Sequence, residues 1–343
     1  MRTVLLWMLA GLLLTSCLRG PTPPGGAGTE LLWPPPPESP RIQWLQEIRT
    51  PGDLDIKPGF WRRLGNLAFG AREEQLVRPY GILSDPQGRL LVADTGGRTL
   101  EIFDVKAGKH HRLGRQNGPM LLSPLGLTSD PQGQIYLTDS TAGEIYRLQA
   151  DGTLNSWATG LLRPTGIVFN PRTRLIYVTD TAAHQIVAFN SQGVEIFRIG
   201  KRGAKVGELN FPTDLAVDHE GQLLVTDALN ARIQIFSPEG APVSAFGQAG
   251  DVPGTLAKPK GLAVDSDGHI YVCDAQQDQV QIYDAAGQFL LSFGRSGQGP
   301  GEFWMPSGIW IDAGDRIYVT DAFNRRIQVF QYLEAPRTKG DNK

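Results

Sequence analysis

Cysteine and long apolar runs are scarce in this chain of 343 residues. Its two cysteines are Cys17, near the amino terminus, and Cys273, which excludes a fold held together by several disulfide bonds. The apolar run Val4–Leu14 has eleven residues, whereas a membrane-spanning helix needs about 20. The net charge of −2 lacks the basic excess typical of nucleic-acid-binding proteins, so we expect no nucleic-acid partner.

The amino-terminal 40 residues predict a targeting segment followed by a linker. Arg2 and the apolar run after it are typical of a secretory signal peptide, here residues 1–16. The sequence Leu14-Thr15-Ser16-Cys17 resembles a bacterial lipobox, and this resemblance implies that Cys17 carries a lipid. Leu18 then favours the outer membrane of the envelope. An ordinary cleaved signal with an incidental cysteine remains the alternative.

Composition also sets the other boundaries. Residues 17–40 are rich in proline and glycine, which predicts a semi-rigid tether behind the lipid anchor. A folded domain is expected over residues 41–332, and a polar tail over residues 333–343.

A motif that occurs six times determines the predicted fold. Each copy opens with Pro-x-(Gly/Asp), passes through a short apolar strand and a turn, and reaches a second strand that ends in Asp. The copies begin 45, 40, 48, 47 and 47 residues apart. A repeat of this length made of short strands predicts an all-β, six-bladed β-propeller. The opening prolines are Pro79, Pro124, Pro164, Pro212, Pro259 and Pro306.

The last copy has no fourth strand of its own after Phe330. The segment Arg41–Ile48 looks like a strand and belongs to no repeat. We therefore expect this amino-terminal strand to complete the sixth blade and close the ring, which removes exposed strand edges. Between it and the first repeat, Pro58–Leu67 has the spacing of a short amphipathic helix, expected to pack across one end of the ring, with a membrane-facing or partner-facing patch as the alternative.

The clearest copies, Pro259–Tyr283 and Pro306–Phe330, resemble the NHL repeat. Together with the lipobox and the run Trp33–Pro37, the repeats resemble bacterial lipoproteins of uncharacterised function built as six-bladed propellers. NHL-type propellers include scaffolds, protein and RNA binders and a few lyases and hydrolases, so the resemblance implies the fold and leaves the activity open.

Six aspartates end the second strand of every copy. Because all blades have one, we expect them to cap their own turns rather than to bind metal. They are Asp94, Asp139, Asp180, Asp227, Asp274 and Asp321.

Histidine gives no metal site either. A related lyase of this fold binds zinc through three histidines, and the segment Tyr177–Gln185 resembles one of its ligand segments, which would match His184. The other two histidines would follow the opening proline, where this chain has no histidine. Since a catalytic zinc usually needs three protein ligands, we expect no metal and no cofactor.

Residues that differ between blades are the better candidates for binding. Several lie four or five positions past the second-strand aspartate or in the loop after the third copy, and they are mostly basic. They predict a surface for an anionic partner such as a polysaccharide, a lipid headgroup or an acidic protein, with solvated rim charges as the alternative. The candidates are Arg98, His184, Lys201, Arg202, Arg232, Lys260, Arg325 and Arg326.

The sequence thus favours a lipid-anchored binding or scaffold module of the bacterial cell envelope, attached to the membrane through its lipid and in contact with an envelope protein or an anionic polysaccharide. No catalytic residue is identified. The competing hypothesis is a metal-assisted lyase or hydrolase with its site at the central channel.

Overall fold

The computed structural model describes residues 30–57, 74–114 and 118–334. The chain divides into two compact units, residues 1–30 and 31–343, and every strand of the described residues lies in the second. Cys17 and the helix expected over Pro58–Leu67 lie outside the described residues. Within the described ranges, no helix is long and apolar enough to cross a membrane.

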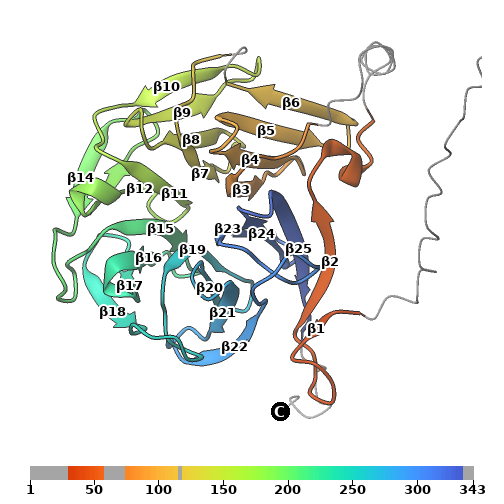
Figure 1. Ribbon diagram of the computed structural model, residues 1–343. Helices are drawn as coiled ribbons and strands as arrows, with labels where there is room; N and C mark the ends of the chain where they lie inside the picture. Colours follow the sequence, from red (N-terminus) through yellow and green to blue (C-terminus); the bar gives the residue numbers. More distant parts are fainter. Residues whose placement is uncertain (1–29, 58–73, 115–117, 335–343) are drawn as a thin grey trace, which may run out of the picture. The chain divides into compact units, whose positions relative to one another are not determined.

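Six antiparallel sheets surround a central axis, which confirms the six-bladed propeller (Figure 1). The first five blades have four strands each, taken in chain order. Blade one contains β3 (Pro79–Ser84), β4 (Leu90–Asp94), β5 (Thr99–Asp104) and β6 (Lys109–Leu113). Blade two contains β7 (Pro124–Ser129), β8 (Ile135–Asp139), β9 (Glu144–Leu148) and β10 (Leu154–Ala158). Blade three contains β11 (Pro164–Asn170), β12 (Leu175–Asp180), β13 (Gln185–Phe189) and β14 (Glu195–Ile199).

The remaining blades follow the same plan until the ring closes. Blade four contains β15 (Pro212–Val217), β16 (Leu223–Asp227), β17 (Arg232–Phe236) and β18 (Pro242–Phe246). Blade five contains β19 (Pro259–Val264), β20 (Ile270–Asp274), β21 (Gln279–Tyr283) and β22 (Phe289–Phe293). Blade six contains β23 (Pro306–Ile311), β24 (Arg316–Asp321), β25 (Arg326–Tyr332), β2 (Ile42–Ile48) and β1 (Leu32–Trp33). Three single-turn 3₁₀ helices complete the described elements: η1 (Pro51–Leu54), η2 (Thr181–Ala183) and η3 (Ala228–Asn230).

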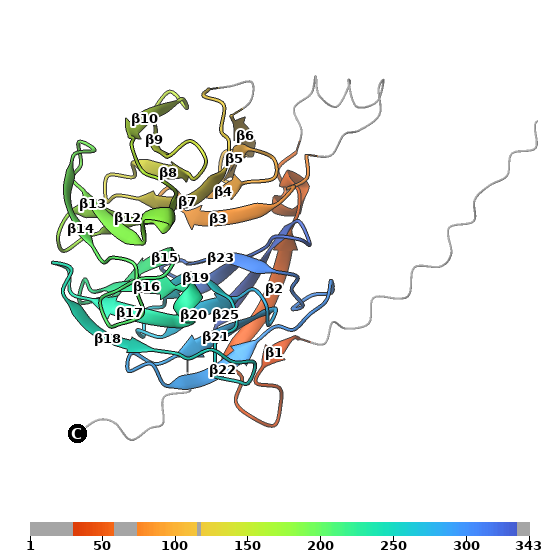
Figure 2. The ribbon, with the colours of Figure 1, turned by 60° about the vertical axis from the view of Figure 1, so that its left-hand side comes forward.

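Strand β2 pairs antiparallel with β25, from Ile42 opposite Tyr332 to Ile48 opposite Ile327. The expected closure by an amino-terminal strand is therefore confirmed (Figures 1 and 2). One boundary needs correction. Leu32–Trp33, inside the expected tether, forms β1 on the outer edge of β2, so the folded unit begins near Leu31 and not at Arg41. The Trp33 ring packs against Phe293 and Phe330, and this burial explains why the strand extends into a proline-rich segment.

Hydrophobic residues form six clusters, one between each pair of neighbouring blades. The cluster between blades six and one, for example, combines Ile48 and Ile327 with Ile82 and Val92. Each blade therefore depends on both neighbours for its burial, which is how a closed ring of sheets is stabilised.

The two ends of the ring differ. At one end, which we call the entry face, the inner strand of each blade begins and the second strand turns into the third; Pro79, Asp94 and Thr99 share this level in blade one. At the opposite end, the hairpin face, the inner strand turns into the second. Turns such as Asp85–Gly88 and Asp130–Gly133 lie there, each closed by a hydrogen bond from the glycine N–H to the aspartate carbonyl.

Candidate functional site

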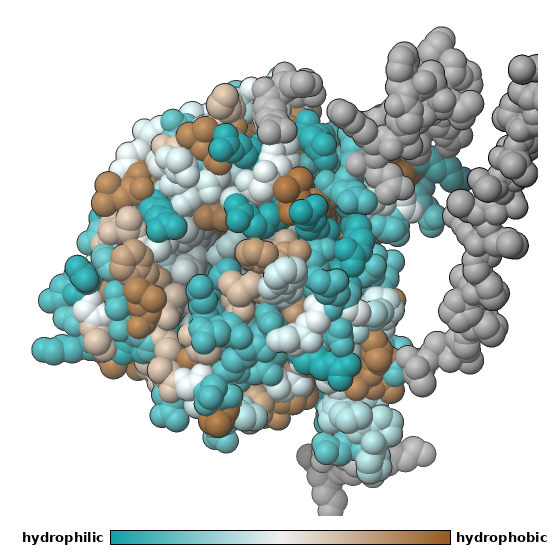
Figure 3. Space-filling view, viewed as in Figure 1, coloured by the Kyte–Doolittle hydropathy of each residue, from teal (hydrophilic) through white to brown (hydrophobic). Residues whose placement is uncertain are grey.

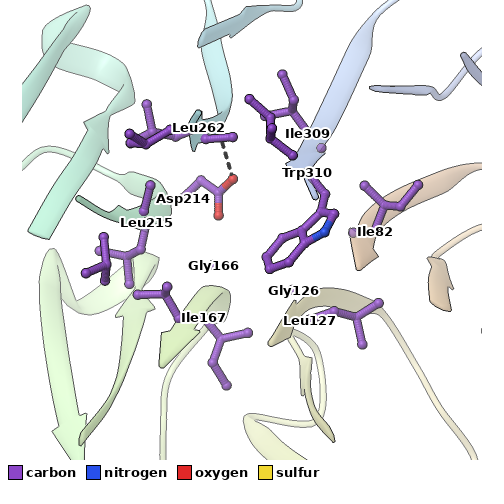
Figure 4. A pocket seen from close by; sticks show the side chains of 18 of the residues that line it. Ile82, Gly126, Leu127, Gly166, Ile167, Asp214, Leu215, Leu262, Ile309 and Trp310 are labelled. Carbon is purple, nitrogen blue, oxygen red and sulfur yellow. Dashed lines mark hydrogen bonds between the residues drawn. The ribbon is translucent and has the colours of Figure 1, made fainter. Parts of the chain in front are cut away.

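The inner strands of all six blades enclose a cavity of about 430 Å³ on the central axis. Figure 3 shows the molecular surface hollowed where these strands converge. An aliphatic side chain from every blade lies in the cavity wall, at the third position after the opening proline (Figure 4). The six residues are Ile82, Leu127, Ile167, Leu215, Leu262 and Ile309.

Asp214 is the exception in the layer just before these residues. Five blades have glycine there, and the glycines are required because inner strands approach closely: a Cβ at Gly81 would lie 1.8 Å from the Leu125 carbonyl oxygen. In blade four the chain places Asp214 instead. Its Oδ2 accepts the Leu262 N–H of blade five at 3.0 Å, and its carboxyl group points into the cavity (Figure 4).

Burial raises the pKa of Asp214 to about 7, although the N–H groups of Leu215 and Leu262 act in the opposite direction. A carboxyl group in an apolar wall is costly to ionise, so its surroundings account for the shift. Near neutral pH, Asp214 can therefore either donate or accept a proton.

Two further side chains shape the cavity. The Trp310 ring of blade six reaches into it, at a position held by Leu83, Thr128, Val168, Ala216 and Ala263 in the other blades (Figure 4). At the hairpin face the lining extends to His219, which is exposed. The cavity thus runs from the Asp214 layer to the hairpins.

Tyr80 and Lys260 lie at the other end of the cavity. The Lys260 Nζ lies 5.6 Å from the centroid of the Tyr80 ring, so the pair spans from blade five to blade one past the small Ser307. Burial raises the pKa of Tyr80, as does the charge of Asp214 from the opposite blade, while burial lowers the pKa of Lys260. Both residues directly follow an opening proline, Pro79 or Pro259, so they lie at the entry-face end of the inner strands.

The structure spreads the other sequence candidates over the entry face. Arg98 and Arg325 are exposed in the turns after β4 and β24, each at a left-handed position with φ of 56°. Lys201 and Arg202 are exposed in the loop between blades three and four, where Lys201 Nζ lies 3.6 Å from Glu208 Oε1.

Three candidates have structural partners instead. Arg326 is 0% exposed and donates to Asp321, Glu47 and two carbonyl groups, so it is not available to a partner molecule. Arg232 similarly holds Asp227 and the carbonyls of Lys205 and Glu208. The prediction that Arg326 and Arg232 belong to a basic binding surface is therefore wrong, because both are held by partners within the protein.

His184 is also internal rather than on the rim. It is 8% exposed, its ring contacts Phe211, and its Nδ1 accepts the Phe211 N–H at 3.1 Å. It therefore shapes the entry to blade four and does not face a ligand.

The six second-strand aspartates are all buried and accept backbone N–H groups from the segment just before their own inner strand. Asp180, for instance, accepts the N–H groups of Leu162 and Arg163 at 3.0 and 2.8 Å. Each carboxylate thus fixes the start of an inner strand.

Sequence reasoning missed Asp214 and the basic residues next to the opening prolines. The signal for Asp214 was present, since it alone replaces glycine at its repeat position. Arg78, Arg163 and Lys258 immediately precede their prolines and are exposed.

The donor set does not fit a bound metal. Among residues 30–57, 74–114 and 118–334, no three His, Cys, Asp or Glu side chains come close enough to hold one. The cavity layer of Asp214 is otherwise glycine, and glycine offers no side-chain ligand.

Comparison with known families gives two matches. Residues 66–247 match the family described as SMP-30/Gluconolactonase/LRE-like region. Residues 217–290 and 262–335 match a family described as 6-bladed beta-propeller. No curated protein matches the chain.

Solved structures with the same fold come from proteins of different activities. A virginiamycin B lyase from Staphylococcus aureus has 16% identity and a TM-score of 0.58 over 76% of this chain and 97% of the lyase. A gluconolactonase from Xanthomonas campestris has 19% identity and a TM-score of 0.59 over 76% and 88%. An auxiliary nutrient binding protein from Bacteroides thetaiotaomicron has 15% identity and a TM-score of 0.60 over 76% and 70%. At these identities the likeness shows the fold alone.

Proposed function

This chain belongs to the SMP-30/Gluconolactonase/LRE-like family, and we propose that within it the protein is a binding module of the bacterial cell envelope, anchored by a lipid on Cys17. Its ligand is a small, mainly apolar molecule held in the central cavity. The envelope location rests on the signal-like residues 1–16 and the lipobox-like sequence before Cys17.

The observation that carries the binding function is the make-up of the cavity wall. Its volume of about 430 Å³ lies within the range of small-molecule sites, roughly 300–1,000 Å³. Six aliphatic side chains and the Trp310 ring favour an apolar ligand, and Asp214 offers one polar contact. A cavity with apolar walls and few polar groups is typical of ligand recognition.

An enzyme remains the second candidate, because of Asp214. A carboxyl group with a pKa near 7 is suited to general acid or base catalysis at neutral pH. A metal-assisted lyase or hydrolase, however, finds no donor set among the described residues. Any reaction in this cavity would rely on Asp214 for proton transfer.

Filling the cavity tests the binding function. Val168 of β11 has the same position in its strand as Trp310 in β23, so Val168→Trp places a second indole in the cavity. Val194→Trp, in an exposed turn of the same blade, is the matched control. Thermal unfolding is recorded with a panel of uncharged aromatic and alicyclic compounds.

We expect some compounds to raise the melting temperature of the wild type and of Val194→Trp, but not that of Val168→Trp. Stabilisation that persists in Val168→Trp, or a panel without effect on the wild type, would contradict a cavity ligand. The envelope location is tested separately: the protein should fractionate with membranes, and Cys17→Ala should release it.

A further inference from the structure

Exposed apolar side chains collect on the entry face. Four of them lie two positions before an opening proline, and two more lie in the turns between second and third strands. Five of the six blades contribute at least one. They are Val77, Leu122, Leu162, Trp304, Leu229 and Phe323, each between 36% and 70% exposed.

Trp304 and Phe323 form a pair within this set. Their ring centroids lie 5.5 Å apart, and both side chains are 47% exposed. Apolar groups gathered at one face of a protein mark an interaction surface.

Basic side chains alternate with these apolar groups. Arg78, Arg163 and Lys258 directly precede the opening prolines of blades one, three and five, and all three are exposed. Arg98 and Arg325 lie in the neighbouring turns. In the part of the chain that the structure describes, these five side chains form no ion pair, so their charges are available to an anionic surface.

The length of the predicted linker limits how far the folded unit can lie from the predicted anchor. Leu31 lies beside Gly301, in the loop that leads from β22 into the entry face of blade six. Leu32 of β1 pairs with Gln43, which in turn lies opposite Gln331, so the predicted linker joins the folded unit on the outer edge of blade six. Only 13 residues separate Cys17 from Leu31, a span of at most about 45 Å when fully extended.

We propose that the entry face docks on an anionic lipid bilayer. Trp304, Phe323 and Leu162 enter the headgroup region, where aromatic and apolar side chains are stabilised, and Arg78, Arg163 and Lys258 contact lipid phosphates. The hairpin face, with the exposed end of the cavity at His219, then points away from the membrane. This inference concerns a different surface from the cavity ligand, and it does not depend on that ligand.

Vesicle binding of the predicted mature chain, residues 17–343, with Cys17→Ala tests the docking without the lipid. The vesicles contain phosphatidylethanolamine and phosphatidylglycerol, and phosphatidylcholine vesicles give the neutral reference. We expect binding to the anionic vesicles that weakens with salt. The triple variant Arg78→Ala/Arg163→Ala/Lys258→Ala should lose about fivefold in affinity per cation. The double variant Trp304→Ala/Phe323→Ala should bind more weakly at every salt concentration.

A matched control comes from the hairpin face. Val105, Lys106 and Lys109 lie in or next to the turn between β5 and β6, and all three are exposed. Their triple alanine variant should bind the anionic vesicles as the wild type does, and thermal unfolding confirms that each variant is folded.

Two results overturn the docking proposal. One is a failure of the Cys17→Ala chain without further substitutions to bind anionic vesicles, which would leave an acidic protein as the partner of this face. The other is an equal loss in the control variant. Neither result affects the thermal shifts that test the cavity ligand, so failure of the two proposals can be told apart.

Discussion

The Nη1 atom of Arg326 lies 2.6 Å from the Oε2 atom of Glu47, and this ion pair joins the last strand of the chain to the amino-terminal strand β2. The same guanidinium group donates through Nε to Asp321 and through Nη2 to the carbonyls of Gly299 and Glu302. One buried side chain therefore connects β24, β25, β2 and the loop from blade five.

Arg326→Ala should destabilise the propeller strongly, because it leaves the Asp321 carboxylate buried without its cation. Breaking a buried pair in this way costs about 3–5 kcal/mol. The neighbouring Arg325→Ala removes an exposed arginine and should change the free energy of unfolding by no more than about 0.5 kcal/mol. Urea unfolding of the two variants measures the difference. Equal stabilities would contradict the structural role of Arg326.

Asp214 should make the protein less stable as the pH rises towards neutrality. The folded protein holds its proton up to a pKa of about 7, whereas the unfolded chain releases it near 3.8. The folded state thus binds the extra proton between these values, and the stabilisation, complete below the lower value, is lost as the pH rises through the upper one.

Asp214→Asn keeps an acceptor for the Leu262 N–H and removes the titration. Its advantage in stability over the wild type should therefore be larger at about pH 8 than at about pH 5, as measured by urea unfolding at both values. Asp284→Asn, in the turn between β21 and β22, reports what the same exchange does away from the cavity. An advantage that does not change with pH would show that Asp214 does not titrate in this range.

Asp180→Ala should destabilise the start of the inner strand of blade three, β11. It removes the acceptor of two N–H groups, those of Leu162 and Arg163, and each orphaned group costs about 1–3 kcal/mol if it stays buried. Asp151→Ala removes an exposed turn aspartate and should cost less than about 0.5 kcal/mol. Amide hydrogen exchange of the first residues of β11 locates the effect. Unchanged protection there would mean that Asp180 does not fix this strand.

Strand β2 should contribute to stability mainly through its inward side chains. Ile42 is 0% exposed and packs with Phe330, whereas Leu45 in the same strand is 40% exposed. Ile42→Ala should lower the free energy of unfolding by about 2–5 kcal/mol. Leu45→Ala should change it by about 0.5 kcal/mol or less. Thermal unfolding of both variants compares the loss of stability from a buried and from an exposed side chain of β2. Similar losses would contradict the prediction that burial of side chains stabilises the closure.

The repeat made the six blades and the closing strand predictable, because each inner strand, hairpin and second-strand aspartate recurs in register. The repeat could not predict which arginines are buried, because some of their partners lie outside the repeated motif. Arg325 and Arg326 are neighbours in the sequence, and Arg326 is internal because it contacts Asp321, the loop from blade five and Glu47, which is 279 residues away. His184 likewise depends on Phe211 in the next blade.

Asp214 shows the opposite case. The sequence shows a single carboxylate where the other five copies have glycine, but its role could be inferred only from its position in the structure. Only the structure shows that this layer lies at the cavity and that Leu262 of the next blade supplies the N–H partner. Strand β1 was missed because prolines after Trp33 indicated a linker, while the aromatic contacts that hold it lie at the far end of the chain.

The pairing of β2 with β25 also makes closure of the ring a contact between distant parts of the chain. Trp44 of β2 donates a hydrogen bond to Gln328 of β25, 284 residues further along. Blades one to five join residues that are much closer in the sequence, whereas the sixth has an unpaired edge until β2 and β25 meet. We therefore expect folding to pass through an open, incomplete stage, and a chain truncated before residue 326 would remain in it.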